Sequence, residues 1–85
     1  MSKTIFKYKW ADTVQVPIGA EILHADFQGT DLMFWALVDP DAELESRTLI
    51  LVPTGHITVP DELNMRYINT VFQGQYVWHL FEESK

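Results

Sequence analysis

The chain lacks cysteine and is short of basic residues, and these two shortages exclude several classes of protein. Without cysteine there are no disulfides, no thiol nucleophile and no thiolate metal site. Six Lys and Arg against 12 Asp and Glu give a net charge of −6 at pH 7. This acidity argues against binding to duplex nucleic acid, which favours a basic face. No apolar run reaches the roughly 18 residues of a membrane span, and no signal-peptide pattern is visible. We therefore expect a soluble, cytoplasmic protein that does not contact a membrane.

Patterns that carry catalysis or hold cofactors are also missing. The four glycines stand in separate turns, so none belongs to a glycine-rich phosphate loop. His24, His56 and His79 lie on separate segments and lack the spacing of helical metal ligands. The acidic run at residues 39–43 lacks the glycine and the final glutamate of a calcium loop. No serine lies in a nucleophile elbow. The sequence therefore predicts no metal, no cofactor and no enzymatic activity.

The sequence is rich in the alternating apolar pattern of β-strands. Eighty-five residues, 47% of them apolar and 13% aromatic, are enough for one small domain over residues 1–85. The pattern predicts strands at residues 5–10, 14–16, 20–27, 32–38, 47–52, 67–73 and 75–82. Gly29 and Gly74 mark two hairpin turns, and Pro60 followed by acids predicts one short helical turn at residues 60–64. We expect an all-β or β-rich α+β fold with a mainly antiparallel small sheet or barrel.

Several predicted strands are apolar on both faces. In residues 32–38, Leu32, Phe34, Ala36 and Val38 alternate with a second apolar set that includes Trp35. An antiparallel sheet with one wet face would instead show a polar residue at every second position. Both faces must therefore be covered. We expect a homo-oligomer, a dimer or larger, and the alternative is a tightly curled monomer whose termini cover the second face.

The candidate ligand-binding residues are aromatic side chains and one polar loop. Three Trp, three Tyr and five Phe are many for so short a chain, and aromatic rings can stack on bases or fill an interface. Small polar residues after the strand at residues 47–52 leave backbone N–H groups accessible for an anion or a nucleotide. Each candidate also has an ordinary structural explanation. The mid-strand tryptophans could simply belong to the core, the loop could be a plain turn, and the arginine could pair with an acidic residue of the chain. The candidates are Trp35, Arg47, Thr54, Gly55, His56 and Trp78.

Three segments, residues 5–8, 35–40 and 76–82, together resemble a small uncharacterised family found mainly in tailed phages and in prophage-like regions of bacteria. Residues 17–23 and 54–56 also fit the pattern, so the resemblance spans nearly the whole chain. One departure is that Gln75 stands between Gly74 and the last strand. The resemblance implies no reaction and no catalytic residue.

What the resemblance implies is a non-enzymatic phage accessory protein that binds a host component stoichiometrically in the host cytoplasm. In one version it inhibits a host defence system through protein–protein contact, with an acidic surface facing a basic site. The residues for that contact are Asp61, Glu62, Glu82 and Glu83. In the alternative version an oligomer sequesters a small nucleotide-type signal in an aromatic pocket. The net charge of −6 favours the first version, and the aromatic residues favour the second.

Overall fold

The computed structural model describes residues 2–55 and 64–83, and every regular element in these two ranges is a β-strand. The strands are β1 (Thr4–Lys9), β2 (Thr13–Pro17), β3 (Glu21–Gln28), β4 (Asp31–Val38), β5 (Leu44–Pro53), β6 (Met65–Gln73) and β7 (Tyr76–Glu83). All pairings between them are antiparallel, so the predicted fold class is confirmed. The helical turn expected at residues 60–64 lies outside the described residues except for Asn64, which belongs to no regular element.

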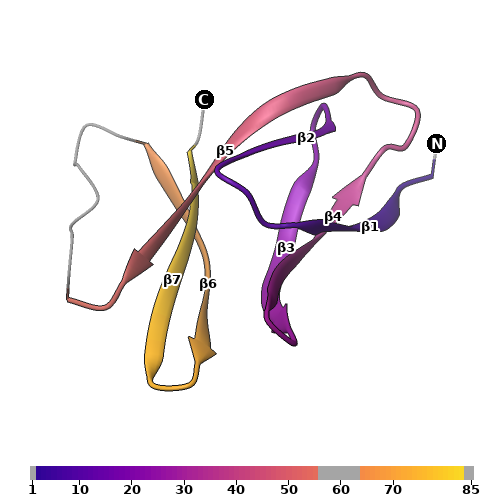
Figure 1. The fold of residues 1–85 in the computed structure, drawn as a ribbon. Helices are drawn as coiled ribbons and strands as arrows, with labels where there is room; N and C mark the ends of the chain where they lie inside the picture. The colour runs from indigo at the N-terminus through magenta and orange to yellow at the C-terminus, as the bar shows by residue number, and fades with distance from the viewer. Residues whose placement is uncertain (1, 56–63, 84–85) are drawn as a thin grey trace.

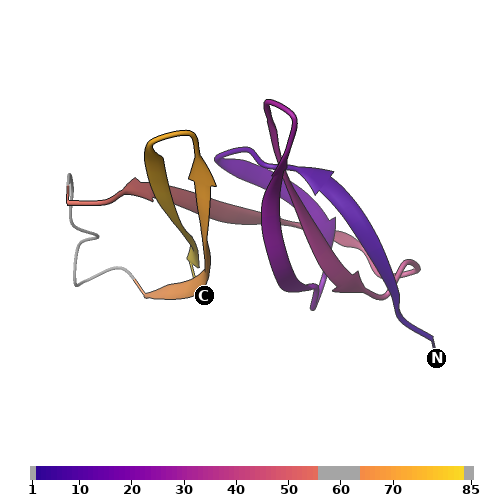
Figure 2. The same cartoon turned by 90° about the horizontal axis from the view of Figure 1, so that it is seen from below.

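The strands form a three-stranded sheet in the order β1-β4-β3 and a four-stranded sheet in the order β2-β5-β7-β6 (Figure 1). Strand β5 is the longest and serves two partners in succession. Its first half, Leu44–Thr48, pairs with β2, and its second half, Leu49–Pro53, pairs with β7. Figure 2 shows β5 running across the molecule as a result. The pairing with β2 explains why β5 begins three residues before the predicted start at Arg47, where the sequence is too polar to indicate a strand.

The core lies between the inward faces of the two sheets. Along β4 the side chains of Leu32, Phe34, Ala36 and Val38 are buried, whereas the residues between them are only half-buried. The predicted alternation is therefore confirmed for this strand. The other buried apolar residues come from five further segments: Val14, Val16, Ala20, Ile22, Ala25, Leu49, Val71 and Leu80. The outward faces of both sheets are less well covered than the core faces.

A single amide side chain links the edges of the two sheets. Asn69 Oδ1 accepts a hydrogen bond from the N–H of Ala25 at 2.9 Å, and Asn69 Nδ2 donates to the carbonyl of Ala25 at 2.8 Å. The register of β6 shifts between Tyr67 and Asn69, and this irregularity turns the amide toward β3. Ala25 is fully buried, and Asn69 makes with its backbone the two hydrogen bonds that a neighbouring strand would otherwise make. Strands β3 and β6 are joined by this side chain and not by a backbone ladder, so the described strands do not close a barrel.

Two hairpin turns, each with a glycine, lie near the candidate site. Gly29 between β3 and β4 has a φ of 64°, and Gly74 between β6 and β7 has a φ of 59°. Side chains with a Cβ rarely adopt this region, so both hairpin turns were predictable from the glycines. The tips of the two hairpins lie toward the same end of the molecule (Figure 1).

Candidate functional site

A cleft of about 230 Å³ opens between the two sheets near the hairpin tips. Both sheets contribute to its walls, because residues from the ends of β1, β3 and β4 face residues from β5, β6 and β7. The lining residues are Lys9, Trp10, Phe27, Thr30, Asp31, Leu32, Leu51, Gln73 and Trp78. Four strand ends and one hairpin turn therefore converge on a single hollow that carries two of the three tryptophans.

The two tryptophans of the cleft are held by contacts on their inner sides. The backbone N–H of Trp10 donates to the carbonyl of Leu32 at 2.8 Å, and the Trp10 ring meets Phe34 edge to face, with ring centroids 6.0 Å apart. On the opposite sheet, Trp78 Nε1 lies 3.4 Å from Gln73 Oε1, to which it donates. Both indoles pack against the core while remaining partly exposed. Their outward surfaces are therefore fixed in place and available for stacking.

The polar groups of the cleft carry no net charge. Lys9 Nζ lies 3.6 Å from Asp31 Oδ1, and both side chains are exposed. Exposed pairs of this kind contribute little to stability, so both groups can exchange partners at small cost. Thr30 and Gln73 add a hydroxyl and an amide. The cleft therefore combines aromatic surfaces with neutral hydrogen-bonding groups, which suits a planar ring that has polar edges.

The structure distributes the predicted ligand-binding residues over four places. Trp78 is the one that lines the cleft. Trp35 lies on the outward face of the three-stranded sheet, with its ring 6.3 Å from that of His24. Arg47 lies in the first half of β5, paired with β2. His56 falls outside the described residues. Trp10 was not among the predicted ligand-binding residues, although its alternation with Tyr8 already placed it on the same face as a core-packing aromatic.

Thr54 and Gly55, also predicted to bind a ligand, lie at the end of β5 beside a histidine. Thr54 Oγ1 is 2.7 Å from His79 Nε2, and His79 Nδ1 is 2.9 Å from Thr70 Oγ1. The imidazole therefore bridges the two hydroxyls through its two ring nitrogens. A second hollow of about 320 Å³ borders Thr54 and is lined by Pro53, Thr54, Gln75, Tyr76 and Val77. Described residues supply no arginine or lysine to this lining.

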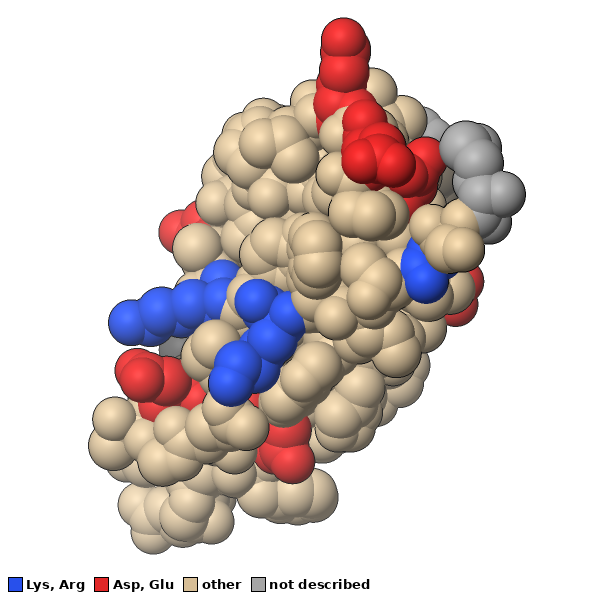
Figure 3. Space-filling model, turned by 90° about the vertical axis from the view of Figure 1, so that its right-hand side faces the viewer, with Lys and Arg blue, Asp and Glu red and all other residues tan. Residues whose placement is uncertain are grey.

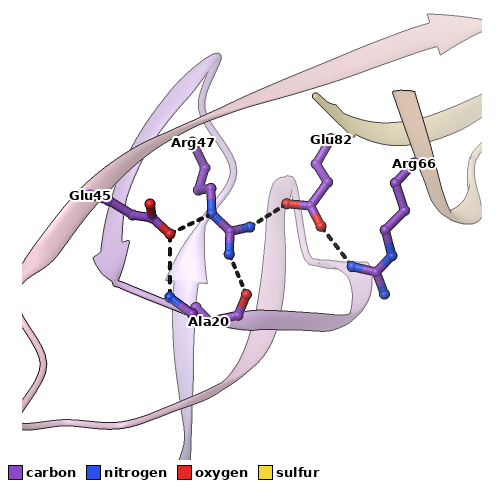
Figure 4. Close-up of polar contacts among 6 residues, drawn as sticks. Ala20, Glu45, Arg47, Arg66 and Glu82 are labelled. Atoms are coloured by element: carbon purple, nitrogen blue, oxygen red, sulfur yellow. Dashed lines mark hydrogen bonds and ion pairs between the residues drawn. The ribbon is translucent and has the colours of Figure 1, made fainter. Parts of the chain in front are cut away.

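Arg47 belongs to an internal network and not to either hollow (Figure 4). Its Nε donates to Glu45 at 3.0 Å, one terminal nitrogen donates to Glu82 at 2.7 Å, and the other donates to the carbonyl of Ala20. Burial alone would lower the pKa of Arg47, but the hydrogen bonds to Glu82 and Glu45 and their negative charges outweigh it and raise the pKa. The guanidinium is thus a permanently charged structural group. Pairing with an acid, the more ordinary of the two alternatives for Arg47, is what the structure shows.

Glu82 requires a correction, because it is not part of an acidic surface. The residue is 4% exposed, and each carboxylate oxygen accepts a hydrogen bond at 2.7 Å, one from Arg47 and one from Arg66. Its position in β7 has the same parity as Trp78 and Leu80, so the alternation already placed it on the inward face. Of the other acidic candidates, Glu83 is half-buried, and Asp61 and Glu62 lie outside the described residues.

Among residues 2–55 and 64–83, no three His, Asp or Glu side chains gather as a metal ion would require. In the same residues we find no helix with the length and apolar character needed to cross a membrane.

The comparison with known proteins identifies the family. A family model described as a domain of unknown function, DUF7352, matches residues 1–85, and the chain therefore belongs to this family. No curated protein and no solved structure matches the chain. The family description names no activity, ligand or partner.

Proposed function

We propose that this protein is a non-enzymatic binding protein that captures a planar, ring-containing molecule in the cleft between Trp10 and Trp78. The observation that carries the proposal is that two anchored indoles from opposite sheets line one hollow together with neutral polar groups. Indole surfaces stack on flat rings whatever their substituents. The amide of Gln73 and the hydroxyl of Thr30 offer both donors and acceptors to the edge of such a ring.

The size and charge of the cleft narrow the ligand to the nucleoside class. A volume of about 230 Å³ is below the roughly 300–1,000 Å³ of most small-molecule pockets. It suits one base with a sugar better than a dinucleotide. A phosphate group finds little attraction, because Lys9 is balanced by Asp31 and the network occupies both arginines. The net charge of −6 adds a weak long-range repulsion of anions.

This proposal develops the sequestration version of the function expected from the sequence. For contact with a basic protein surface, Glu83 is the remaining candidate among the described residues, since Glu82 is buried. If the phage resemblance holds, the captured molecule would be a small host metabolite or signal built on a base.

A thermal-shift series tests the proposal. The probes are adenosine, guanosine, cytidine and uridine, each compared with its 5′-monophosphate. A nucleoside at 100 times its dissociation constant stabilises the folded state by about 2.7 kcal/mol, which raises the melting temperature by roughly 10–20 °C for a domain of this size. We expect at least one nucleoside to produce such a shift and its monophosphate to produce a smaller one.

Two tryptophan variants locate the binding. Trp78→Leu should abolish the shift, whereas Trp35→Leu, which removes an indole from outside the cleft, should retain it. Because Trp78 also packs against the core, Gln73→Ala serves as a second variant. It removes the acceptor of the Trp78 Nε1 hydrogen bond but no core-packing ring, and it should weaken binding. The proposal is wrong if no nucleoside stabilises the wild-type protein, or if Trp35→Leu loses the shift and Trp78→Leu keeps it.

A further inference from the structure

The outward face of the three-stranded sheet carries a half-buried tryptophan, Trp35, at its centre. We call this surface the Trp35 face. In register, β1 and β3 flank the middle strand β4, so that Lys7 and His24 stand on either side of Trp35. The face consists of Ile5, Lys7 and Lys9 on β1, Met33, Trp35 and Leu37 on β4, and Glu21, Leu23, His24 and Asp26 on β3. Leu23 joins the face because the register of β3 shifts at this point.

The apolar part of the Trp35 face is poorly covered. Trp35 is half-buried, Ile5 is 56% exposed and Leu23 is 42% exposed, whereas Phe34 and Ala36 on the opposite face of the sheet are completely buried. A tryptophan at the centre of a contiguous exposed apolar patch is the feature most often found at the energetic centre of a protein interface. Some of this apolar area is therefore expected to be removed from water by a partner.

The charges on the Trp35 face are segregated between its two edges. The edge formed by β1 carries Lys7 and Lys9, and the edge formed by β3 carries Glu21 and Asp26. Within the chain, Lys7 Nζ donates to Gln28 Oε1 at 3.0 Å and Lys9 lies 3.6 Å from Asp31, both in exposed positions. Figure 3 shows basic side chains gathered on one part of this side of the molecule, with acidic side chains both directly beside them and at the upper end.

This segregation makes the face complementary to itself, and we propose that a second copy of the chain packs on it to form a symmetric dimer. A two-fold axis that runs along β4 places β1 of one copy over β3 of the other, since β4 is the middle strand. Lys9 then faces the partner's Asp26, Lys7 faces the partner's His24, and Ile5 faces the partner's Glu21. Trp35 packs against the partner's Trp35 at the centre. An axis perpendicular to the strands is disfavoured because it places Lys7 over the partner's Lys7.

The area of the face sets the strength of the association. Three strands about 4.8 Å apart, each contributing about six residues of roughly 3.3 Å, present a projected area on the order of 300 Å². Stable complexes bury about 800 Å² per partner. The dimer is therefore reversible and depends on protein concentration. The cleft lies between the inward faces of the sheets, and Lys9 is the residue that it shares with the Trp35 face.

Sedimentation velocity over protein concentrations from about 10 µM to about 1 mM tests the proposal. The wild-type protein should shift from monomer toward dimer across this range, and Trp35→Ala should remain monomeric. The matched control is Phe72→Ala, which removes a ring that is 69% exposed on the four-stranded sheet and should leave the association unchanged.

Charge exchange tests the orientation of the two copies. Lys9→Glu and Asp26→Lys should each weaken the dimer at least several-fold, whereas the double variant, in which the two charges are exchanged, should regain the wild-type affinity. A wild-type protein that stays monomeric throughout would overturn the proposal. So would a dimer that survives Trp35→Ala but is lost in Phe72→Ala, or one whose affinity is unaffected by either single charge change.

Discussion

Removal of the Glu82 carboxylate should be one of the most damaging single changes at a polar residue of this protein. The carboxylate joins β7 to β5 through Arg47 and to β6 through Arg66, with both N···O distances at 2.7 Å. The Arg47 side chain is 15% exposed and keeps its charge. In Glu82→Ala this positive charge therefore loses one of its partners at a site that water reaches poorly. Removing one partner of a buried ion pair costs about 3–5 kcal/mol.

The expected loss lies at the lower end of that range. Arg66 is 47% exposed and is rehydrated easily, so its bond to Glu82 contributes little to the loss. Arg47 keeps its bond to Glu45 at 3.0 Å. We therefore expect Glu82→Ala to lower the free energy of unfolding by about 3 kcal/mol, out of roughly 4–13 kcal/mol for a domain of this length. Glu82→Gln, which retains the shape and some hydrogen bonding, should cost less.

Urea unfolding at pH 7, followed by tryptophan fluorescence, measures both variants. Glu83→Ala is the matched control, because it removes the same group one residue along the strand, on the opposite face of the sheet, and should change stability by no more than about 0.5 kcal/mol. Adding Arg47→Met to Glu82→Ala should recover part of the loss, since the stranded charge is then gone. Equal stabilities for Glu82→Ala and Glu83→Ala would refute the assignment of Glu82 as a buried structural ion.

Three other changes have expected outcomes. Asn69→Ala leaves the buried N–H of Ala25 without its partner and should cost about 1–3 kcal/mol, with faster hydrogen exchange at that amide; an unchanged exchange rate would contradict the role of Asn69 as a link between the sheets. Gly74→Ala places a Cβ at a φ of 59° and should cost about 1 kcal/mol in urea unfolding, and a neutral result would contradict the turn geometry. Burial raises the pKa of Tyr8 above 10.0, so the folded state holds this proton more tightly than the unfolded state. Stability should therefore fall as the pH rises past 10, and Tyr8→Phe should reduce that fall; identical pH profiles would argue against it.

The fold was largely predictable because most strands can be recognised from the alternation of apolar residues over a few neighbouring positions. Strand β4 alternates two apolar sets, and the structure buries the set that contains Phe34. The two hairpins follow from Gly29 and Gly74, which no other residue type replaces easily at a positive φ. The start of β5 was missed because Leu44–Arg47 is polar and becomes a strand only through its pairing with β2.

The site was less predictable because it depends on contacts between distant residues. The cleft brings Trp10 and Trp78 to one hollow, and nothing local in either segment indicates the other. The pairing of Arg47 with Glu82 spans 35 positions, although the parity of Glu82 with Leu80 already indicated an inward side chain. The link between Asn69 and Ala25 spans 44 positions and depends on an irregularity in β6 that sequence alternation does not reveal.

The side-chain N–H signals of the three tryptophans provide the most direct test of the proposed binding site. In a two-dimensional ¹H–¹⁵N spectrum of the wild-type protein, each indole gives one signal, and Trp→Phe variants assign them. Recorded at a low protein concentration, where the proposed dimer is dissociated, a titration with the nucleoside that gives the largest thermal shift should move the signals of Trp10 and Trp78. The signal of Trp35, which lies on the outward face, should stay in place. Movement of the Trp35 signal alone, or of no indole signal at any nucleoside concentration, would contradict ligand capture in this cleft.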